Sequence, residues 1–144
     1  MLLTTIGFSK KSLRDFTAAL QHHKVERVID TRLQNTSQLA GYAKKDDLAY
    51  VLELLHIDYL HELSLAPTEE LLKAIKQKEI PWAEFEKTFV DLLAERKVEA
   101  TMNEWLGDKV PCFMCSEEKP HHCHRKLVVE YLKEFDSRIE IVHL

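Results

Sequence analysis

The chain alternates between short strand-like runs and longer stretches with helical spacing, and this alternation limits its fold more than any other feature. The strand-like runs, rich in β-branched and other apolar residues, are 2–7, 25–30, 57–62, 109–115 and 138–144. Strands that alternate with helices predict a sheet with mostly parallel pairing. We therefore expect a single three-layer α/β domain over residues 1–144, Rossmann-like, with about five mostly parallel strands flanked by helices.

The stretches between these runs carry the marks of helices. Apolar residues recur three or four positions apart in 13–20, 48–55, 82–93 and 127–135. Ser12 followed by Asp15 is typical of a helix start. Trp82, Phe85 and Phe89 share one helical face, so we expect all three in the core.

Length and charge set further limits. The chain has 144 residues, 45% of them hydrophobic, which is enough to bury one core. Its formal charge of −4 and its isoelectric point near 6.1 give no overall attraction to nucleic acid or to an anionic membrane. A polyanion would have to be held by a local cluster of cations. The charge therefore lends a nucleic-acid partner no support, and no membrane partner is expected.

The first residues, MLLTTIGFSKK, turn polar at Thr4 and are too short and too polar for a secretory signal. No run approaches the roughly eighteen apolar residues that indicate a membrane span. We expect a cytoplasmic protein. Three cysteines, an odd number, in a chain with a core of its own argue against a disulfide framework, so we expect reduced thiols.

Polar residues follow three of the expected strands at the point where each strand ends. Ser9 lies beyond the first strand, Asp30 and Arg32 beyond the second, and Cys115 at the end of the fourth. In open parallel sheets, ligands bind beyond the carboxyl ends of the strands. We therefore expect these residues at one edge of the sheet, where Asp30 would orient the Arg32 guanidinium toward an anion.

The segment CSEEKPHHCHR, residues 115–125, is the richest in reactive groups. Cys112 and Cys115 form a C-x-x-C, and Cys123 and His124 follow at a distance that would complete a four-ligand zinc site. Side chains three apart on a strand point to opposite faces, so we expect Cys112 to be a buried core thiol that ligates nothing. We assign no metal ligands, although a looser site of Cys115, Cys123 and a histidine remains open.

A second interpretation makes Cys115 a nucleophile. The thiol ends a strand and would face the positive N-terminal end of the helix that Arg125 opens, which favours a thiolate and binds anions. Arg125 is a cation at the unfavourable end of that helix, so it needs a carboxylate or a bound anion as partner. Glu117 and His124 are candidates for acid or base. The other polar residues of the segment are expected to form a solvated loop: Glu118, Lys119, His121 and His122.

Three motifs stand out along the chain: TIGFS at 5–9, DTR at 30–32, and C-x-E followed by C-H-R within 115–125. Together they resemble the signatures of the family catalogued as domain of unknown function 488, in which a TIGHS-like opening precedes a D-x-R and a similar late motif. Phe8 stands where that family often has histidine, so no role of that histidine carries over. The segment 36–48 resembles one branch of the family. The resemblance implies a compact α/β fold and supplies no substrate.

Two classes of function fit these observations. The first is an enzyme that binds a phosphorylated or nucleotide-like anion at the carboxyl edge of the sheet. Its expected catalytic residues are Cys115, Glu117, Cys123 and His124, and its expected binding residues are Ser9, Asp30, Arg32 and Arg125. The second is a non-catalytic module that binds a nucleotide, a nucleic-acid end or a protein partner in the same pocket, or closes around a metal through cysteine and histidine. The sequence names no cofactor and leaves the oligomeric state open.

Overall fold

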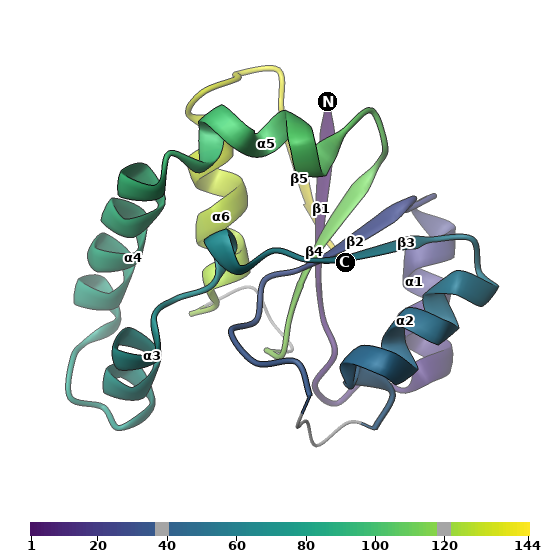
Figure 1. Cartoon of the computed structure of the whole chain (residues 1–144), viewed down its shortest axis with the longest axis horizontal. Coiled ribbons are helices and arrows are strands. Elements are labelled where there is room, and N and C mark those ends of the chain that lie inside the picture. Colours follow the sequence, from purple (N-terminus) through teal and green to yellow (C-terminus); the bar gives the residue numbers. More distant parts are fainter. Residues whose placement is uncertain (37–40, 118–121) are drawn as a thin grey trace.

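Five strands form one sheet in the order β3-β2-β4-β1-β5, and every neighbouring pair runs parallel (Figure 1). The computed structural model describes residues 1–36, 41–117 and 122–144. The strands are Leu2–Gly7 (β1), Arg27–Asp30 (β2), Asp58–His61 (β3), Pro111–Cys115 (β4) and Glu140–His143 (β5). Each strand falls inside the segment predicted for it, and the parallel sheet confirms the α/β class.

The helices of the described residues connect the strands and cover both faces of the sheet. They are Leu13–His22 (α1), Lys45–Leu54 (α2), Glu69–Lys76 (α3), Trp82–Arg96 (α4), Val98–Leu106 (α5) and His124–Lys133 (α6), with 3-10 turns at Gly41–Ala43 (η1) and Leu63–Leu65 (η2). α1 and α2 lie on one face, whereas α3 to α6 lie on the other, which gives the expected three layers (Figure 1). None of the described helices combines the length and the apolar character that a membrane crossing needs.

Two apolar clusters join the helices to the sheet. Under α1 and α2, Phe16 and Leu48 belong to a cluster that includes Met114 of β4. On the other face, Phe89 of α4 belongs to a larger cluster with Phe113, the residue before Met114 on the same strand. Both faces of β4 are therefore buried, as its unbroken apolar run requires of a central parallel strand.

The alternation along β4 also separates its two cysteines. Cys112 lies in the cluster under α1 and α2 and is fully buried, which confirms its prediction as a core thiol. Burial raises the pKa of Cys112 to about 12, so its thiol stays protonated at neutral pH. Cys115, three residues later, ends the strand at the carboxyl edge of the sheet.

The strand order creates a crevice at that edge. β4 lies between β2 and β1, so Gly7 pairs with Cys115 and Asp30 pairs with Met114. The helices that follow β1 and β2 cover one face of the sheet, and α6, which follows β4, covers the other (Figure 1). In doubly wound sheets, ligands bind where the connections of neighbouring strands diverge in this way. The fold thus points to the region beyond β4 as the place for a site.

Candidate functional site

The loops beyond β1 and β2 continue to follow β4 past the end of the sheet. The backbone N–H of Ser9 donates to the carbonyl of Ser116 at 3.0 Å, and the N–H of Thr31 donates to the carbonyl of Met114 at 3.0 Å. These bonds hold three chain segments together at one edge. The edge gathers the polar residues that were expected to meet there, namely Ser9, Asp30, Arg32 and Cys115.

Asp30 and Arg32 form a buried ion pair with two parallel hydrogen bonds. Nε of Arg32 donates to Oδ1 of Asp30 at 2.9 Å, and Nη2 donates to Oδ2 at 2.7 Å. Nη2 also donates to the carbonyl of Ala43 at 2.8 Å, and the guanidinium lies 5.1 Å from the centre of the Phe8 ring. Among the described residues, Nη1 of Arg32 is buried without a hydrogen-bond partner. The pair therefore fixes a guanidinium that still has donors to offer.

Tyr59 of β3 completes the surroundings of Asp30. Its hydroxyl donates to Oδ2 of Asp30 at 2.5 Å and accepts a bond from Nδ2 of Asn35 at 3.0 Å. Burial, and then the charge of Asp30, raise the pKa of Tyr59, so the phenol stays protonated and keeps donating. The Asp30 carboxylate is thus held by donors from two sides.

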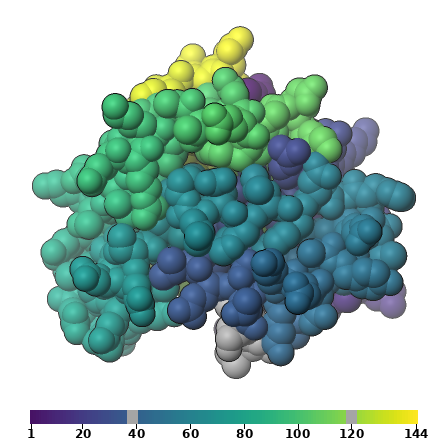
Figure 2. All heavy atoms as spheres, viewed as in Figure 1, coloured from purple at the N-terminus to yellow at the C-terminus, as the bar shows by residue number. Residues whose placement is uncertain are grey.

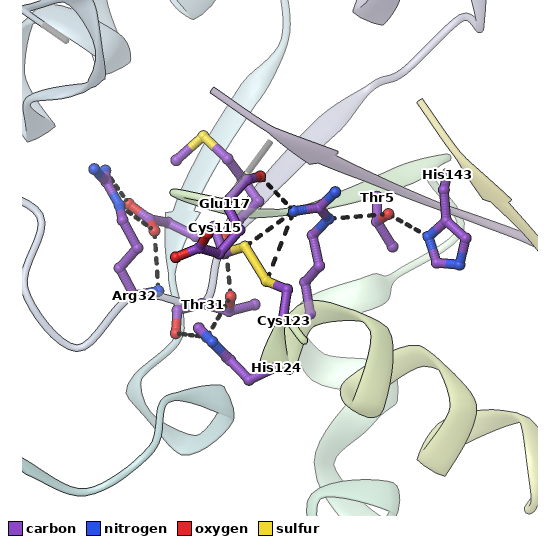
Figure 3. The surroundings of a disulfide bond; sticks show 11 residues. Thr5, Thr31, Arg32, Cys115, Glu117, Cys123, His124 and His143 are labelled. Carbon is purple, nitrogen blue, oxygen red and sulfur yellow. Dashed lines mark hydrogen bonds and ion pairs between the residues drawn. A yellow bond between two sulfur atoms is a disulfide. The ribbon is translucent and has the colours of Figure 1, made fainter. Parts of the chain in front are cut away.

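Arg125 is the largest fully buried side chain among the described residues and lies in the first turn of α6. Its Nη1 donates to the carbonyl of Glu117 at 2.7 Å, to Sγ of Cys115 at 3.1 Å and to Sγ of Cys123 at 3.6 Å (Figure 3). Burial lowers the pKa of Arg125 to about 10, which still leaves the guanidinium charged at neutral pH. The cation thus lies against both sulfurs.

Gly7 makes room for this arrangement. A side chain at Gly7 would collide with the carbonyl of Glu117 and would place its Cβ 2.8 Å from Nη1 of Arg125. Only glycine lets the end of β1 approach this closely. The glycine of the TIGFS motif therefore has a steric function at the site.

A chain of polar groups leads from Arg125 to the last strand. Nε of Arg125 donates to Oγ1 of Thr5 at 3.3 Å, and Oγ1 lies 2.6 Å from Nδ1 of His143 (Figure 3). Burial, and then the charge of Arg125, lower the pKa of His143. A neutral His143 can accept a hydrogen bond from the hydroxyl of Thr5, whose oxygen then accepts a hydrogen bond from Arg125. The guanidinium is thus anchored on its far side as well.

Cys115 and Cys123 are joined in a disulfide, which corrects the expectation of reduced thiols (Figure 3). The expectation rested on the odd number of cysteines. One disulfide can still form in a chain with three cysteines, and it leaves Cys112 as a free thiol. The fold brings the end of β4 to the residue that caps α6, with the two Cα atoms 7.6 Å apart. This separation is wider than the range of about 4.4 to 6.8 Å usual for disulfides.

His124, the first residue of α6, is held by Thr31. Its Nε2 lies 2.9 Å from the carbonyl and 3.0 Å from Oγ1 of Thr31, whose hydroxyl donates to the carbonyl of Met114 at 2.9 Å. Both neighbours of Nε2 are therefore acceptors, and Nε2 carries the proton. Burial, aided by the charge of Arg125, lowers the pKa of His124 to about 4. This suits a neutral hydrogen-bonding group better than a general base at neutral pH.

A cavity of about 890 Å³ opens beyond β2 and β4. Its walls include the segment that follows β2, which reaches the surface between teal segments in Figure 2. Among the described residues, four cationic side chains line it, namely Arg32, Lys73, Lys76 and Lys78, against two carboxylates, Glu69 and Glu117. In a chain with a formal charge of −4, this is a local excess of positive charge. The cavity is thus suited to an anion.

The predicted site residues divide into those that line the cavity and those that lie behind it. The lining residues are Arg32, Cys115, Glu117, Cys123 and His124. Asp30, Ser9 and Arg125 are not among them. Asp30 and Arg125 instead contact lining residues, Arg32 and the two cysteines, from behind.

Sequence reasoning missed one wall of the cavity. Trp82, expected in the core, is only partly buried; it lines the cavity and stacks on the exposed ring of His122 with 4.8 Å between centroids. Lys73 and Lys76 of α3 were not predicted as site residues, because lysines are common on protein surfaces. Their spacing of three residues places them on the same side of one helix, and this was the feature of the sequence that could have indicated a cationic wall. The expectations for Glu118, Lys119, His121 and residues 37–40 lie outside the described residues.

Within residues 1–36, 41–117 and 122–144, no cluster of three or more histidine, cysteine, aspartate or glutamate side chains is arranged to hold a metal ion. The alternative of a cysteine and histidine metal site therefore finds no support in this part of the chain.

A protein-family model described as Domain of unknown function DUF488 matches residues 12–132. The match covers more than half of the chain and includes both the DTR motif and the late cysteine motif. The TIGFS motif, which contributes Gly7, lies before the matched region. No curated protein and no solved structure matches the chain.

Proposed function

The chain belongs to the DUF488 family, and we propose that it binds a small phosphorylated or nucleotide-like anion in the cavity beyond β2 and β4. The family description names no activity, so the proposal rests on the site alone. Arg32 carries it: a buried guanidinium lines the cavity and has one nitrogen, Nη1, without a partner among the described residues. Buried donors of this kind are costly unless something accepts from them.

The position of Arg32 is fixed before any ligand arrives. Asp30 holds two of its nitrogens, the carbonyl of Ala43 takes a further N–H, and Phe8 contacts the plane of the guanidinium. A guanidinium that is already fixed loses little conformational entropy when its remaining nitrogen, Nη1, donates to an oxyanion. Arg32 is therefore the expected main anion contact.

The start of α6 adds a second source of positive potential. This helix has ten residues, and its N-cap, Cys123, makes no side-chain bond to the N–H groups of the first turn. Cys123 and His124 line the same cavity as Arg32. Helix N-termini bind anions through such N–H groups and through the helix dipole. The dipole and the fixed guanidinium thus favour the same kind of ligand.

The lysines of the cavity extend the positive region outward. Lys73 and Lys76 end α3, and Lys78 follows in the next turn; all three are exposed. Exposed cations hold an anion weakly and guide its approach. Trp82 and His122 add aromatic surface nearby, which suits a ligand with a ring such as a nucleotide.

As an enzyme, the protein would use Cys115 as nucleophile and Glu117 as acid or base, since both line the cavity beside Arg32. One observation favours the alternative of a non-catalytic binding module: Cys115 and Cys123, the cysteines that line the cavity, are bonded to each other, so neither is a thiol that could attack a ligand. Iodoacetamide labelling of the reduced protein separates the two. Faster labelling of Cys115 than of a free cysteine near neutral pH supports the enzyme, and slower labelling supports the module.

Thermal melts test the binding site itself. Sodium phosphate and sodium sulfate should raise the melting temperature above that in sodium chloride at matched ionic strength. The double variant Lys73→Gln/Lys76→Gln should lose part of this shift, and Arg32→Lys should lose most of it because lysine has no nitrogen in the place of Nη1. Lys87→Gln/Lys133→Gln, exposed lysines with the same change in charge outside the cavity, is the control. An equal anion response in wild type and in all three variants would refute the proposal.

A further inference from the structure

The structure points to a second activity at the same edge of the sheet. We propose that Cys115 and Cys123 form a reversible dithiol–disulfide centre that a hydroperoxide oxidises and a small-molecule thiol reduces. This goes beyond anion binding, because it concerns the transfer of electrons between the sulfurs and a second class of molecule. It rests on the position of the two sulfurs, their access to the cavity and their contact with Arg125.

The two sulfurs come from different elements that meet only in the folded chain. Cys115 ends β4, and Cys123 caps α6, so the pair lies where the helix dipole favours negative charge. Each of the two cysteines has an exposed fraction of only 2%, and both line the cavity. A small reagent therefore reaches them from the cavity, whereas larger molecules are kept away.

Arg125 supplies a charge that favours the thiolate form of the reduced pair. Its Nη1 lies 3.1 Å from Sγ of Cys115 and 3.6 Å from Sγ of Cys123. The guanidinium is fully buried and is held in place by Thr5 and by the carbonyl of Glu117. Charges interact more strongly in such dry surroundings than in water. Because Cys115 is the nearer sulfur, we assign the attacking thiolate to Cys115 and the resolving thiol to Cys123.

The oxidation then proceeds in two steps. The Cys115 thiolate attacks the outer oxygen of the hydroperoxide; an S–O bond forms, the O–O bond breaks, and the leaving alkoxide takes a proton to become an alcohol, or water when the peroxide is hydrogen peroxide. The Cys123 thiol next attacks the sulfenic sulfur of Cys115. The S–S bond forms, the S–O bond breaks, and hydroxide leaves with the proton of Cys123 as water. Two electrons pass from the sulfurs to the peroxide.

Two small-molecule thiols reduce the disulfide and so reverse the oxidation. The thiolate of the first attacks one sulfur of the disulfide, which gives a mixed disulfide and releases the other cysteine. The thiolate of the second attacks the mixed disulfide and leaves as the oxidised small-molecule disulfide. Both protein sulfurs recover the protons that the two thiols bring, so atoms and electrons balance.

Cys112 provides an internal control. It lies three residues before Cys115 on the same strand, but on the opposite face and in the apolar core. Burial raises the pKa of Cys112 to about 12, and a protonated buried thiol reacts slowly. The proposal therefore predicts two reactive cysteines and one inert one within a single chain.

Intact-mass spectrometry tests the electron balance. The reduced protein should take up two N-ethylmaleimide labels under native conditions, with Cys112 labelled only after denaturation. One equivalent of hydrogen peroxide should abolish both native labels and remove two hydrogens from the mass, and dithiothreitol should restore both. Stable sulfinic acid at Cys115, a disulfide between two chains, or labels that survive the peroxide would each overturn the proposal.

A second measurement tests Arg125 and does not depend on disulfide formation. In Cys123→Ser, the rate of Cys115 alkylation by iodoacetamide should be half-maximal below about pH 8.5, the value for a free cysteine. Arg125→Met in that background should move the midpoint upward by one unit or more, a tenfold fall in rate at lower pH, and Arg125→Lys should restore part of it. Circular dichroism confirms that each variant is folded. A midpoint at or above that of free cysteine in Cys123→Ser would refute the role of Arg125.

Discussion

Arg32 and Arg125 are both buried at the same edge of the sheet, but they have different partners. Arg32 shares two hydrogen bonds with the carboxylate of Asp30. Arg125 donates to the sulfurs of Cys115 and Cys123, to the carbonyl of Glu117 and to the hydroxyl of Thr5. The first guanidinium thus shares its hydrogen bonds with a carboxylate, whereas the second lies against two sulfurs whose charge depends on their oxidation state.

This difference separates two functions of a buried cation. A guanidinium that is neutralised by a fixed carboxylate acts as a rigid donor, and its pair must stay intact for the fold to be stable. A guanidinium on two sulfurs gains an anionic neighbour when a thiolate forms and loses that neighbour when the disulfide forms. The edge therefore combines a fixed ion pair, Asp30 and Arg32, with a guanidinium, Arg125, whose surroundings change with oxidation.

The largest effect on the Arg32 centre is expected when the carboxylate of Asp30 is removed. Asp30→Asn keeps the shape of the side chain but leaves Arg32 buried without its counter-charge, and breaking a buried pair costs about 3 to 5 kcal/mol. Urea unfolding followed by circular dichroism measures the loss. Asp58→Asn is the matched control, because Asp58 pairs with Arg27 at the surface with nearly half of its side chain exposed. It should cost about 1 kcal/mol or less, and equal losses in the two variants would show that burial does not set the value of the Asp30 pair.

The surroundings of Arg125 can be changed by a substitution at Gly7 that adds no charge. In Gly7→Ala, the new methyl group meets the carbonyl of Glu117 and the guanidinium, so both must move. We expect a loss of about 3 kcal/mol, at the upper end for overpacked sites, together with slower alkylation of Cys115. Gly41→Ala introduces the same group where nothing lies within 4 Å, and it should be nearly neutral in urea unfolding. A stable Gly7→Ala protein with unchanged thiol reactivity would contradict the steric function of Gly7.

His124 lies between the two centres and titrates. The pKa of His124 is about 4 in the folded chain, against about 6.5 when unfolded, so the unfolded state binds more protons between these values. The stability that this difference contributes is present above pH 6.5 and is lost as the pH falls toward 4. We expect a loss of about 2 kcal/mol, reduced from the full shift because His124 is only partly buried.

Urea unfolding at a series of pH values checks this. His124→Gln keeps an amide that can donate to Thr31 and removes the titration, so its stability should fall less steeply over the same interval. His143 also has a lowered pKa and accounts for a remaining slope, which His143→Gln should reduce in turn. Parallel pH curves for wild type and His124→Gln would show that His124 does not titrate as its surroundings indicate.

The sheet was predictable because its cause is local. Apolar runs such as 2–7 and 109–115 are too short for helices and are separated by helical spacing, and a chain of this kind has few other folds open to it. The strand order was not predictable, because hydrophobic periodicity does not say which strands pair. That β4 lies between β1 and β2 follows from long-range packing.

Part of the candidate site followed from the rule that ligands bind beyond the carboxyl ends of parallel strands. This rule placed Arg32 and Cys115 together. The direction of a side chain is harder to infer from sequence. Arg125 was expected to face a ligand but lies behind the sulfurs, because Gly7 leaves space there. Trp82 was assigned to the core from its spacing, and spacing cannot tell a core face from a cavity wall.

The central place of β4 has a consequence for how the chain folds. β1 and β2 are consecutive in sequence but do not touch in the sheet, because β4 lies between them. The contact of Thr4 with Pro111 joins residues 107 positions apart, and such distant contacts slow folding because a long loop must close first. Until β4 inserts, β1 and β2 have no partner that links them, and Cys115 and Arg125 have no place beside Gly7. The two halves of the sheet, β3-β2 and β1-β5, and the parts of the site are therefore joined only when β4 is in place.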